Sequence, residues 1–247
     1  MSSKNNISLG QHWLYNRAIL NEIAELAGEG PLCVEIGPGL GTLTSSLLKR
    51  FEKVVAVEFD ADLARKLPGS FPGKNLEVIN QDFLKYDLDS LPQPYAVAGN
   101  IPYYITSPII EHILAARNLP ENVVLLMQKE VAERITDEKE TLLSLKVKNR
   151  ADAKLGLVVM ASEFTPPPKV NSQVLILKPH ASLVPDEVFK IIEVGFLAPR
   201  KKVVRNLSVL KSREEVKSIF ADIGLDEGLR PGDLSLNDWY KIYQKMI

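Results

Sequence analysis

The tetrapeptide Asn100-Ile101-Pro102-Tyr103 combines residue types that can promote methyl transfer to an exocyclic amine. The amino group of adenine is a poor nucleophile, because its lone pair is delocalised into the ring. The carboxamide oxygen of Asn100 can accept a hydrogen bond from one N–H of that amine, and the main-chain carbonyl beside Pro102 can accept the other. Two such bonds favour a pyramidal nitrogen, and Tyr103 offers a flat face on which the base can stack.

The segments around this tetrapeptide place it at the end of a strand. The apolar segment Tyr95–Gly99 predicts a buried strand, and Pro108 with the apolar run Ile109–Leu114 predicts a helix that has Pro at its first position. Ligands of open α/β sheets bind at the carboxyl ends of strands. Taken alone, the tetrapeptide could equally be an ordinary turn, so the interpretation depends on the sequence upstream.

A glycine-rich turn follows the first predicted strand, Pro31–Ile36. The motif Glu35-Ile36-Gly37-Pro38-Gly39-Leu40-Gly41 leads into a predicted helix over 42–49. Glycines at such a turn let a ligand approach the backbone closely. The spacing G-x-G-x-G is shorter than the dinucleotide fingerprint and fits S-adenosylmethionine better. We therefore count Glu35, Gly37 and Gly39 as candidate cofactor-binding residues.

The next two predicted strands, Lys53–Val57 and Leu76–Asn80, also end in acidic residues. Glu58, about 20 residues past the glycines, is placed to accept hydrogen bonds from ribose hydroxyls, although it could be a surface acid. Asp82 could accept from the adenine amino group of the cofactor, with Phe83 against its ring. Four successive strand ends thus carry candidate residues, which predicts one cofactor site at one edge of the sheet.

The rest of the chain predicts an antiparallel addition to this sheet. A fifth strand is expected over 122–127, a helix over 128–135 and an exposed charged loop over 136–143. Two late strands, over 155–164 and 174–177, could form the antiparallel edge of a mixed sheet. Between them, three prolines at 166–168 form a stiff segment. Phe164 could be a second wall for a stacked base or an ordinary core residue.

The C-terminal part changes from strand to helical periodicity at about residue 185. We therefore predict a first domain over 1–182 and a small all-α domain over 183–247. Residues 141–217 hold 14 Lys and Arg against 7 Asp and Glu, although the whole chain has a net charge of −1. The cluster Arg200, Lys201, Lys202 and Arg205 is a candidate clamp for RNA phosphates.

Composition excludes several other classes of protein. The chain has 247 residues and one cysteine, Cys33, which excludes a disulfide framework and a cysteine-rich zinc site. The three histidines lie far apart, so no metal is expected. The N-terminus lacks an apolar signal core, and no apolar run approaches the roughly 18 residues of a membrane span. We expect a cytoplasmic protein that does not associate with membranes.

Six motifs together resemble the rRNA adenine dimethyltransferases, above all the KsgA family, which modifies small-subunit rRNA. They are Gly10–Leu14, Glu35–Gly41, Asn100–Tyr103, Gln128–Ala132, Pro166–Ser172 and Arg200–Asn206. The resemblance implies a Rossmann-like methyltransferase domain, with a mostly parallel mixed sheet and helices on both faces, plus a helical C-terminal domain. It also implies dimethylation of the N6 atoms of two adjacent adenosines near the 3′ end of 16S rRNA, late in small-subunit assembly. S-adenosylmethionine would be the methyl donor, and a monomer is the default.

The resemblance also assigns roles to individual residues. His12 and Leu14 fall on leader contacts to S-adenosylmethionine. Gly37, Glu58 and Asp82 fall on its methionine, ribose and adenine contacts. Asn100 falls on both the cofactor and the target amine, while Tyr103 and Phe164 fall on the residues that sandwich the target base.

Three positions depart from the usual pattern. His12-Trp13 stand where the family usually has Asn-Phe, and Tyr104 stands where it usually has Asn. The segment 141–146 replaces a usual Tyr-Gly-Arg. We therefore expect altered cofactor affinity and an altered substrate contact, with the catalytic tetrapeptide intact.

Two alternatives remain open on sequence alone. The macrolide-resistance branch methylates one adenosine of large-subunit rRNA and shares the glycine motif and Asn-x-Pro-Tyr. The Arg200–Asn206 cluster and the 128–132 motif favour the small-subunit branch. A ribosome-assembly factor that kept the fold and lost turnover is the second alternative, and the intact Asn100 and Glu58 argue against it. A DNA adenine methyltransferase would more usually have Asp at position 100.

Overall fold

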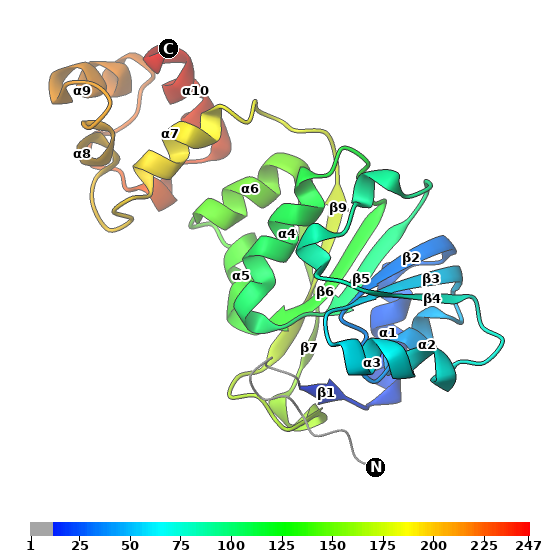
Figure 1. Cartoon of the computed structure of the whole chain (residues 1–247). Coiled ribbons are helices and arrows are strands. Elements are labelled where there is room, and N and C mark those ends of the chain that lie inside the picture. The colour runs from blue at the N-terminus through cyan, green and yellow to red at the C-terminus, as the bar shows by residue number, and fades with distance from the viewer. Residues whose placement is uncertain (1–11) are drawn as a thin grey trace. The chain divides into compact units, whose positions relative to one another are not determined.

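The structure, a computed structural model, describes residues 12–247, and the larger of its two compact units is built around a mixed seven-stranded sheet (Figure 1). Gly10 and Gln11 of the leader motif lie outside the described residues. The strand order is β4-β3-β2-β5-β6-β9-β7. Strands β2 to β6 run parallel to one another, and β9 is antiparallel to β6. The sequence prediction of a mostly parallel sheet with a late antiparallel strand is confirmed.

The strand bounds agree with the sequence predictions to within a few residues, except in β7. The strands of the main sheet are β2 (Gly30–Ile36), β3 (Phe51–Glu58), β4 (Leu76–Asn80), β5 (Ala96–Asn100), β6 (Asn122–Gln128), β7 (Ala151–Val159) and β9 (Ser172–Pro179). β7 begins four residues before the predicted 155–164 strand and ends five residues earlier. A separate antiparallel pair joins β1 (Trp13–Leu14) to β8 (Phe164–Thr165).

The central strands are buried on both faces, which is why they read as continuous apolar runs. In β5, Ala96 and Ala98 belong to a core cluster on one face, and Val97, between them, is also buried. Helix α1 (Arg17–Ala27) packs against β5 and β6 through Leu20, Ile23 and other apolar residues. The parallel strands therefore end together at one edge, where their last residues meet.

The next four helices begin within two residues of their predicted starts. They are α2 (Thr44–Leu47), α3 (Ala61–Lys66), α4 (Thr106–Ala115) and α5 (Lys129–Thr136). Asp60 caps α3 by accepting from two backbone N–H groups. Pro108 is the third residue of α4, not the first; the position is still within the first turn, where N–H groups lack intrahelical partners.

Contact clustering divides the chain into two compact units. One runs up to Glu133 and resumes at Asp152–His180, and the other takes Arg134–Ala151 and Ala181–Ile247. The second unit contains α6 (Leu142–Arg150), α7 (Val188–Gly195), α8 (Val203–Leu207), α9 (Arg213–Asp222) and α10 (Leu236–Met246). Its helical nature confirms the prediction for the C-terminal part, while its inclusion of α6 differs from the expected boundary at 182/183.

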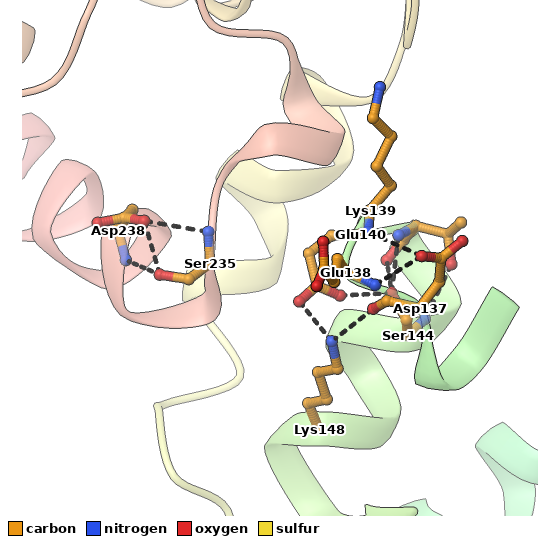
Figure 2. A network of polar contacts seen from close by, with 9 residues as sticks. Asp137, Glu138, Lys139, Glu140, Ser144, Lys148, Ser235 and Asp238 are labelled. Atoms are coloured by element: carbon orange, nitrogen blue, oxygen red, sulfur yellow. Dashed lines mark hydrogen bonds and ion pairs between the residues drawn. The ribbon is translucent and has the colours of Figure 1, made fainter. Parts of the chain in front are cut away.

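A polar network builds the start of α6 within the segment expected to be an exposed loop (Figure 2). The Glu140 carboxylate accepts hydrogen bonds from Ser144 Oγ at 2.7 Å and from Lys148 Nζ at 2.6 Å. Thr141 caps the helix through the Ser144 N–H. Asp137 to Lys139 are exposed as predicted, but the helix begins at Leu142.

A separate apolar core holds the second unit together. Trp239, Phe220 and Leu207 are buried at its centre, and Leu145 of α6 joins them. Gly195 is required here, because a Cβ at this position would overlap the Trp239 indole. In the described part of the chain, no helix has both the length and the apolar character needed to cross a membrane.

Candidate active site

A cavity of about 290 Å³ opens at the carboxyl ends of β2, β3 and β5 and just after β4. It gathers nearly all of the candidate residues predicted from the sheet unit. Those in its lining are His12, Leu14, Glu35, Gly37, Gly39, Glu58, Asp82, Asn100, Ile101, Pro102 and Tyr103. Residues from positions 12 to 103 thus meet because the parallel strands end at one edge.

The glycine turn has a shape that only glycine provides. Gly37 and Gly39 have φ angles of 61° and 56°, in the left-handed region that other residues rarely adopt. A Cβ on Gly39 would overlap the Trp13 ring, whereas a Cβ on Gly37 would meet nothing within 4 Å. Gly39 therefore lets the turn pack on strand β1, and Gly37 leaves open space in the cavity.

Glu58 ties the end of β3 to this turn. Its Oε2 accepts from the Gly39 N–H at 3.0 Å, and its Oε1 accepts from the Asp60 N–H at 2.8 Å. The residue is 6% exposed, and this burial raises the pKa of the carboxyl while the two N–H donors oppose the shift. Each carboxylate oxygen has a further lone pair, so Glu58 can hold the turn and still accept from a ligand.

Glu35 lies buried beneath the glycine turn. Thr44 Oγ1 donates to its Oε2 at 2.6 Å. Burial, with a smaller contribution from the Glu58 carboxylate, raises the pKa of Glu35 to about 8. Glu35 is therefore mostly protonated at neutral pH in the folded chain.

Replacing Glu35 by Gln is expected to flatten the pH dependence of stability. Between pH 4.5 and 8 the unfolded chain releases the Glu35 proton while the folded chain keeps it, so the free energy of unfolding falls as pH rises through this window. Glu35→Gln keeps an acceptor for Thr44 and removes that loss, on the order of a few kcal/mol at pH 8. Denaturant unfolding at several pH values measures it.

The matched control is Glu52→Gln, which changes an exposed carboxyl at the start of β3. It should leave the slope of stability against pH unchanged. If Glu35→Gln also left the slope unchanged, Glu35 would be ionised in the folded chain and the assignment of its pKa would be wrong.

The carboxamide of Asn100 is held in one orientation. Its Nδ2 donates to the His12 main-chain carbonyl at 3.2 Å, so Oδ1 is directed away from His12 and remains an acceptor. The next residue, Ile101, donates its N–H to the Leu126 carbonyl of β6 at 3.1 Å. The first two residues of the tetrapeptide are thereby fixed to the leader and to the sheet.

Tyr103 is fixed by contacts at both ends of its side chain. Its hydroxyl is 2.7 Å from Ser172 Oγ, and the His12 ring lies 6.0 Å from its ring at an interplanar angle of 23°. His12 Nδ1 is 2.7 Å from the Pro166 carbonyl and must be the donor, because a carbonyl oxygen only accepts. Burial raises the pKa of the Tyr103 phenol. His12 thus links the leader, the proline segment and the tetrapeptide.

Asp82 and Phe83 lie on the other side of the cavity. Asp82 Oδ1 accepts from the Leu84 N–H at 3.0 Å and caps a short 3-10 turn. Phe83 is buried, with its ring edge-on to His112 at 5.5 Å. Phe59, which follows Glu58, lines the cavity and is 65% exposed. Phe59 was not among the residues predicted from sequence, although an aromatic residue directly after Glu58, the candidate ribose acceptor, was a usable signal.

Phe164 does not reach this cavity. It is 3% exposed and belongs to the core cluster that also contains Leu14, its partner in the β1–β8 pair. Of the two roles considered for Phe164, a base wall and a core residue, the structure shows the core residue. The short β1–β8 pair turns the ring inward. The geometry gives no support to a second base wall at this position.

The basic cluster belongs to the other compact unit. Arg200, Lys201, Lys202 and Arg205 are exposed, while Val203, Val204 and Leu207 of α8 are buried. The buried Asn206 donates to the carbonyls of Gly195 and Ala198 and so holds the loop before the cluster. Within residues 12–247, no group of three or more His, Cys, Asp or Glu side chains could hold a metal ion.

Comparisons with known proteins agree over nearly the whole chain. A family model described as ribosomal RNA adenine dimethylase matches residues 2–247. Ribosomal RNA small subunit methyltransferase A from Thermosynechococcus vestitus is 37% identical over 245 residues, which cover 93% of this chain and 92% of the relative.

Two solved structures share the fold over the full length. A dimethyladenosine transferase from Plasmodium falciparum superposes with a TM-score of 0.79 at 26% identity and covers 96% of this chain and 99% of its own. The 23S rRNA methyltransferase ErmE superposes with a TM-score of 0.75, also at 26% identity, and covers 95% of this chain and 99% of its own. Both the sheet unit and the helical unit therefore have counterparts in solved structures.

Proposed function

Because this chain belongs to the ribosomal RNA adenine dimethylase family, we propose that it dimethylates the N6 atoms of two adjacent adenosines near the 3′ end of 16S rRNA, late in small-subunit assembly. The methyl donor is S-adenosylmethionine. The observation that carries the proposal is the Asn100 carboxamide, whose orientation is fixed by the His12 carbonyl and whose oxygen remains an acceptor in the cavity.

The cavity offers open space and hydrogen-bond acceptors that suit S-adenosylmethionine. The open space at Gly37 admits a ligand against the backbone. Glu58 offers free lone pairs for ribose hydroxyls, and Asp82 offers an acceptor for the adenine amino group. The exposed ring of Phe59 lies next to Glu58 and supplies a face for the same adenine. Acidic side chains also suit a cofactor that carries a sulfonium and an ammonium group.

The tetrapeptide would hold the target amine. The cofactor supplies an activated methyl group, so no side-chain nucleophile is needed. Asn100 Oδ1 and the Ile101 carbonyl would accept the two N6 hydrogens and make the nitrogen lone pair available for the new N–C bond, which would form as the methyl–sulfur bond of the sulfonium breaks and S-adenosylhomocysteine leaves. Tyr103 stacks on the base, and the methylated nitrogen then releases one proton to water. For the second methyl, the one remaining N–H uses one of the two acceptors.

The relatives favour the small subunit over the large one as the substrate. The Thermosynechococcus vestitus relative is named for the small subunit and is 37% identical, whereas the 23S rRNA methyltransferase ErmE is 26% identical. The match to the relative runs over almost the full chain and includes the helical unit. This supports 16S rRNA as the substrate and leaves ErmE-like specificity as the alternative.

The proposed role of the basic cluster is to bind rRNA phosphates. Neutralising Arg200, Lys201 and Lys202 to Gln should weaken binding to small subunits and make it less dependent on salt. Each lost phosphate contact lowers the slope of log affinity against log salt by about 0.7–0.9. Filter binding at several salt concentrations measures this slope, with an expected decrease of about two for the triple variant.

The control removes the same charge from elsewhere in the helical unit. Lys190, Lys241 and Lys245 are also exposed, and their replacement by Gln should leave the slope nearly unchanged. Equal effects of the two triple variants would show that net charge, and not the cluster, determines binding.

Labelled methyl transfer tests the proposed function directly. Undermethylated small subunits, large subunits and free large-subunit rRNA are incubated with the protein and labelled S-adenosylmethionine, and the modified base is mapped. Dimethyladenosine at adjacent positions of 16S rRNA alone is the expected result. Label on large-subunit rRNA would show that the protein has an ErmE-like function and not the proposed one. Subunit binding without transfer to any of the three would indicate an assembly factor that does not catalyse.

A further inference from the structure

Tyr104 is an aromatic residue at the mouth of the cavity that no other described residue holds. It is 64% exposed and lines the cavity. Within residues 12–247, its ring makes no aromatic contact and its hydroxyl makes no hydrogen bond. Tyr103, one residue earlier, is held by His12 and Ser172. The two consecutive tyrosines therefore differ: one is fixed inside the cavity and the other is free at its rim.

The other exposed aromatic side chains in the described part of the chain do not compete for this place. Tyr15 is 50% exposed but does not line the cavity. Phe59 lines it, but follows Glu58 on the side assigned to the cofactor. Tyr104 is thus the exposed cavity-lining ring directly after the tetrapeptide that is proposed to hold the target amine.

A base that enters the cavity leaves its neighbour with an unstacked face. To reach Asn100, the target adenosine must leave its stack, as in other enzymes that modify a base. Its neighbour in the strand stays outside and loses one stacking partner. Aromatic side chains replace such partners in single-stranded RNA. An exposed ring next to Tyr103, the residue proposed to stack on the target base, is suited to that role.

We propose that Tyr104 is the stacking platform for the nucleotide adjacent to the target base. This inference rests on the proposed function, because two adjacent adenosines are modified in it. While one adenosine occupies the cavity, the other stacks on Tyr104, and they exchange places for the second modification. The family usually has Asn at position 104, and Asn has no ring. The proposed platform therefore belongs to chains that have an aromatic residue at this position.

A coupling experiment tests the platform. Small subunits are reconstituted with two forms of 16S rRNA. Both keep one adenosine of the pair, and its neighbour is adenosine in one form and uridine in the other. Uridine is used because it stacks more weakly than adenosine. Single-turnover methylation of the kept adenosine is measured for the wild type and for Tyr104→Ala. We expect the uridine neighbour to slow the wild type about tenfold, and Tyr104→Ala to be slow on both substrates without distinguishing them.

Three further variants keep the test decisive. Tyr104→Phe keeps the ring and should behave as the wild type, whereas Tyr104→Asn removes it and should behave as Tyr104→Ala. Tyr15→Ala, which removes an exposed ring outside the cavity, should behave as the wild type. S-adenosylmethionine affinity and melting temperature are measured for each variant. If Tyr104→Ala folds poorly, the comparison of Tyr104→Asn with Tyr104→Phe still tests whether the ring is needed.

Several results would overturn the platform. Methylation by Tyr104→Ala and Tyr104→Asn at the wild-type rate would do so. A rate for Tyr104→Ala on the uridine substrate that equals the product of the two separate losses would also do so, because independent losses would mean that Tyr104 and the neighbouring base do not interact. A slow Tyr104→Phe would assign the effect to the hydroxyl. Failure of the wild type to methylate the adenosine pair would instead refute the proposed function, which separates the two conclusions.

Discussion

Asn100→Ala should lose methyl transfer on the order of a thousandfold while it still binds small subunits and S-adenosylmethionine. The variant removes the one side-chain acceptor aimed at the amine, and the loss of a single group that stabilises a transition state typically has this size. Binding should largely persist, because Ile101 remains bonded to Leu126 and the other candidate cofactor contacts lie on other strand ends. Single-turnover rates with saturating subunits measure the effect.

A second variant separates the acceptor from its orientation. Asn100→Asp keeps an oxygen acceptor but replaces the Nδ2 donor with an oxygen that faces the His12 carbonyl. It should therefore be more active than Asn100→Ala and much less active than the wild type. If Asn100→Ala lost methylation and subunit binding equally, Asn100 would be a structural residue and the proposed mechanism would be wrong.

Strand positions could be predicted because buried parallel strands have an unmistakable composition. The apolar runs in β3 and β6 have no polar face to confuse with a helix, and both predictions were within two residues of the observed bounds. The sharing of one edge by the strand ends then followed from parallel topology alone. This is why Glu58, Asp82 and Asn100 could be assigned to one site from their positions in the sequence.

Helix α6 could not be predicted, because its signal depends on distant residues. Its apolar residues, Leu142, Leu143, Leu145 and Val147, fit neither a helical nor a strand period well, and the capping box uses Ser144 where a Glu or Gln is usual. Leu145 becomes a core residue only through the C-terminal helices. The same dependence explains why the sequence placed the unit boundary at residue 182 and omitted 134–151.

The fine structure of the site depends on contacts across the whole sheet unit. His12 meets Pro166, which is 154 positions away, and no local pattern indicates that pairing. The sequence allowed Phe164 to be either a wall for a stacked base or a core residue, and its pairing with Leu14 places the ring in the core. The sequence thus predicted which residue types gather at the site, but not which of them face the cavity.

Glu58→Ala should weaken S-adenosylmethionine binding by about a hundredfold. The change removes the proposed ribose acceptor and also leaves the Gly39 and Asp60 N–H groups without their carboxylate. Glu58→Gln should also bind weakly, because one of the two N–H donors would then face an NH₂ group. Calorimetric titration with S-adenosylmethionine and with S-adenosylhomocysteine measures both variants, and the ribose shared by the two ligands predicts similar losses.

The matched control is Asp60→Asn, two residues along. Asp60 caps α3 through Oδ1, and Asn keeps that oxygen, so the charge changes while the cap remains. Its affinity for S-adenosylmethionine should stay within about threefold of the wild type, since Asp60 does not line the cavity. Equal losses for Asp60→Asn and Glu58→Gln would mean that negative charge near the turn matters more than the hydrogen bonds of Glu58. Unchanged affinity in Glu58→Ala would remove Glu58 from the cofactor site and leave it the role of a brace for the glycine turn.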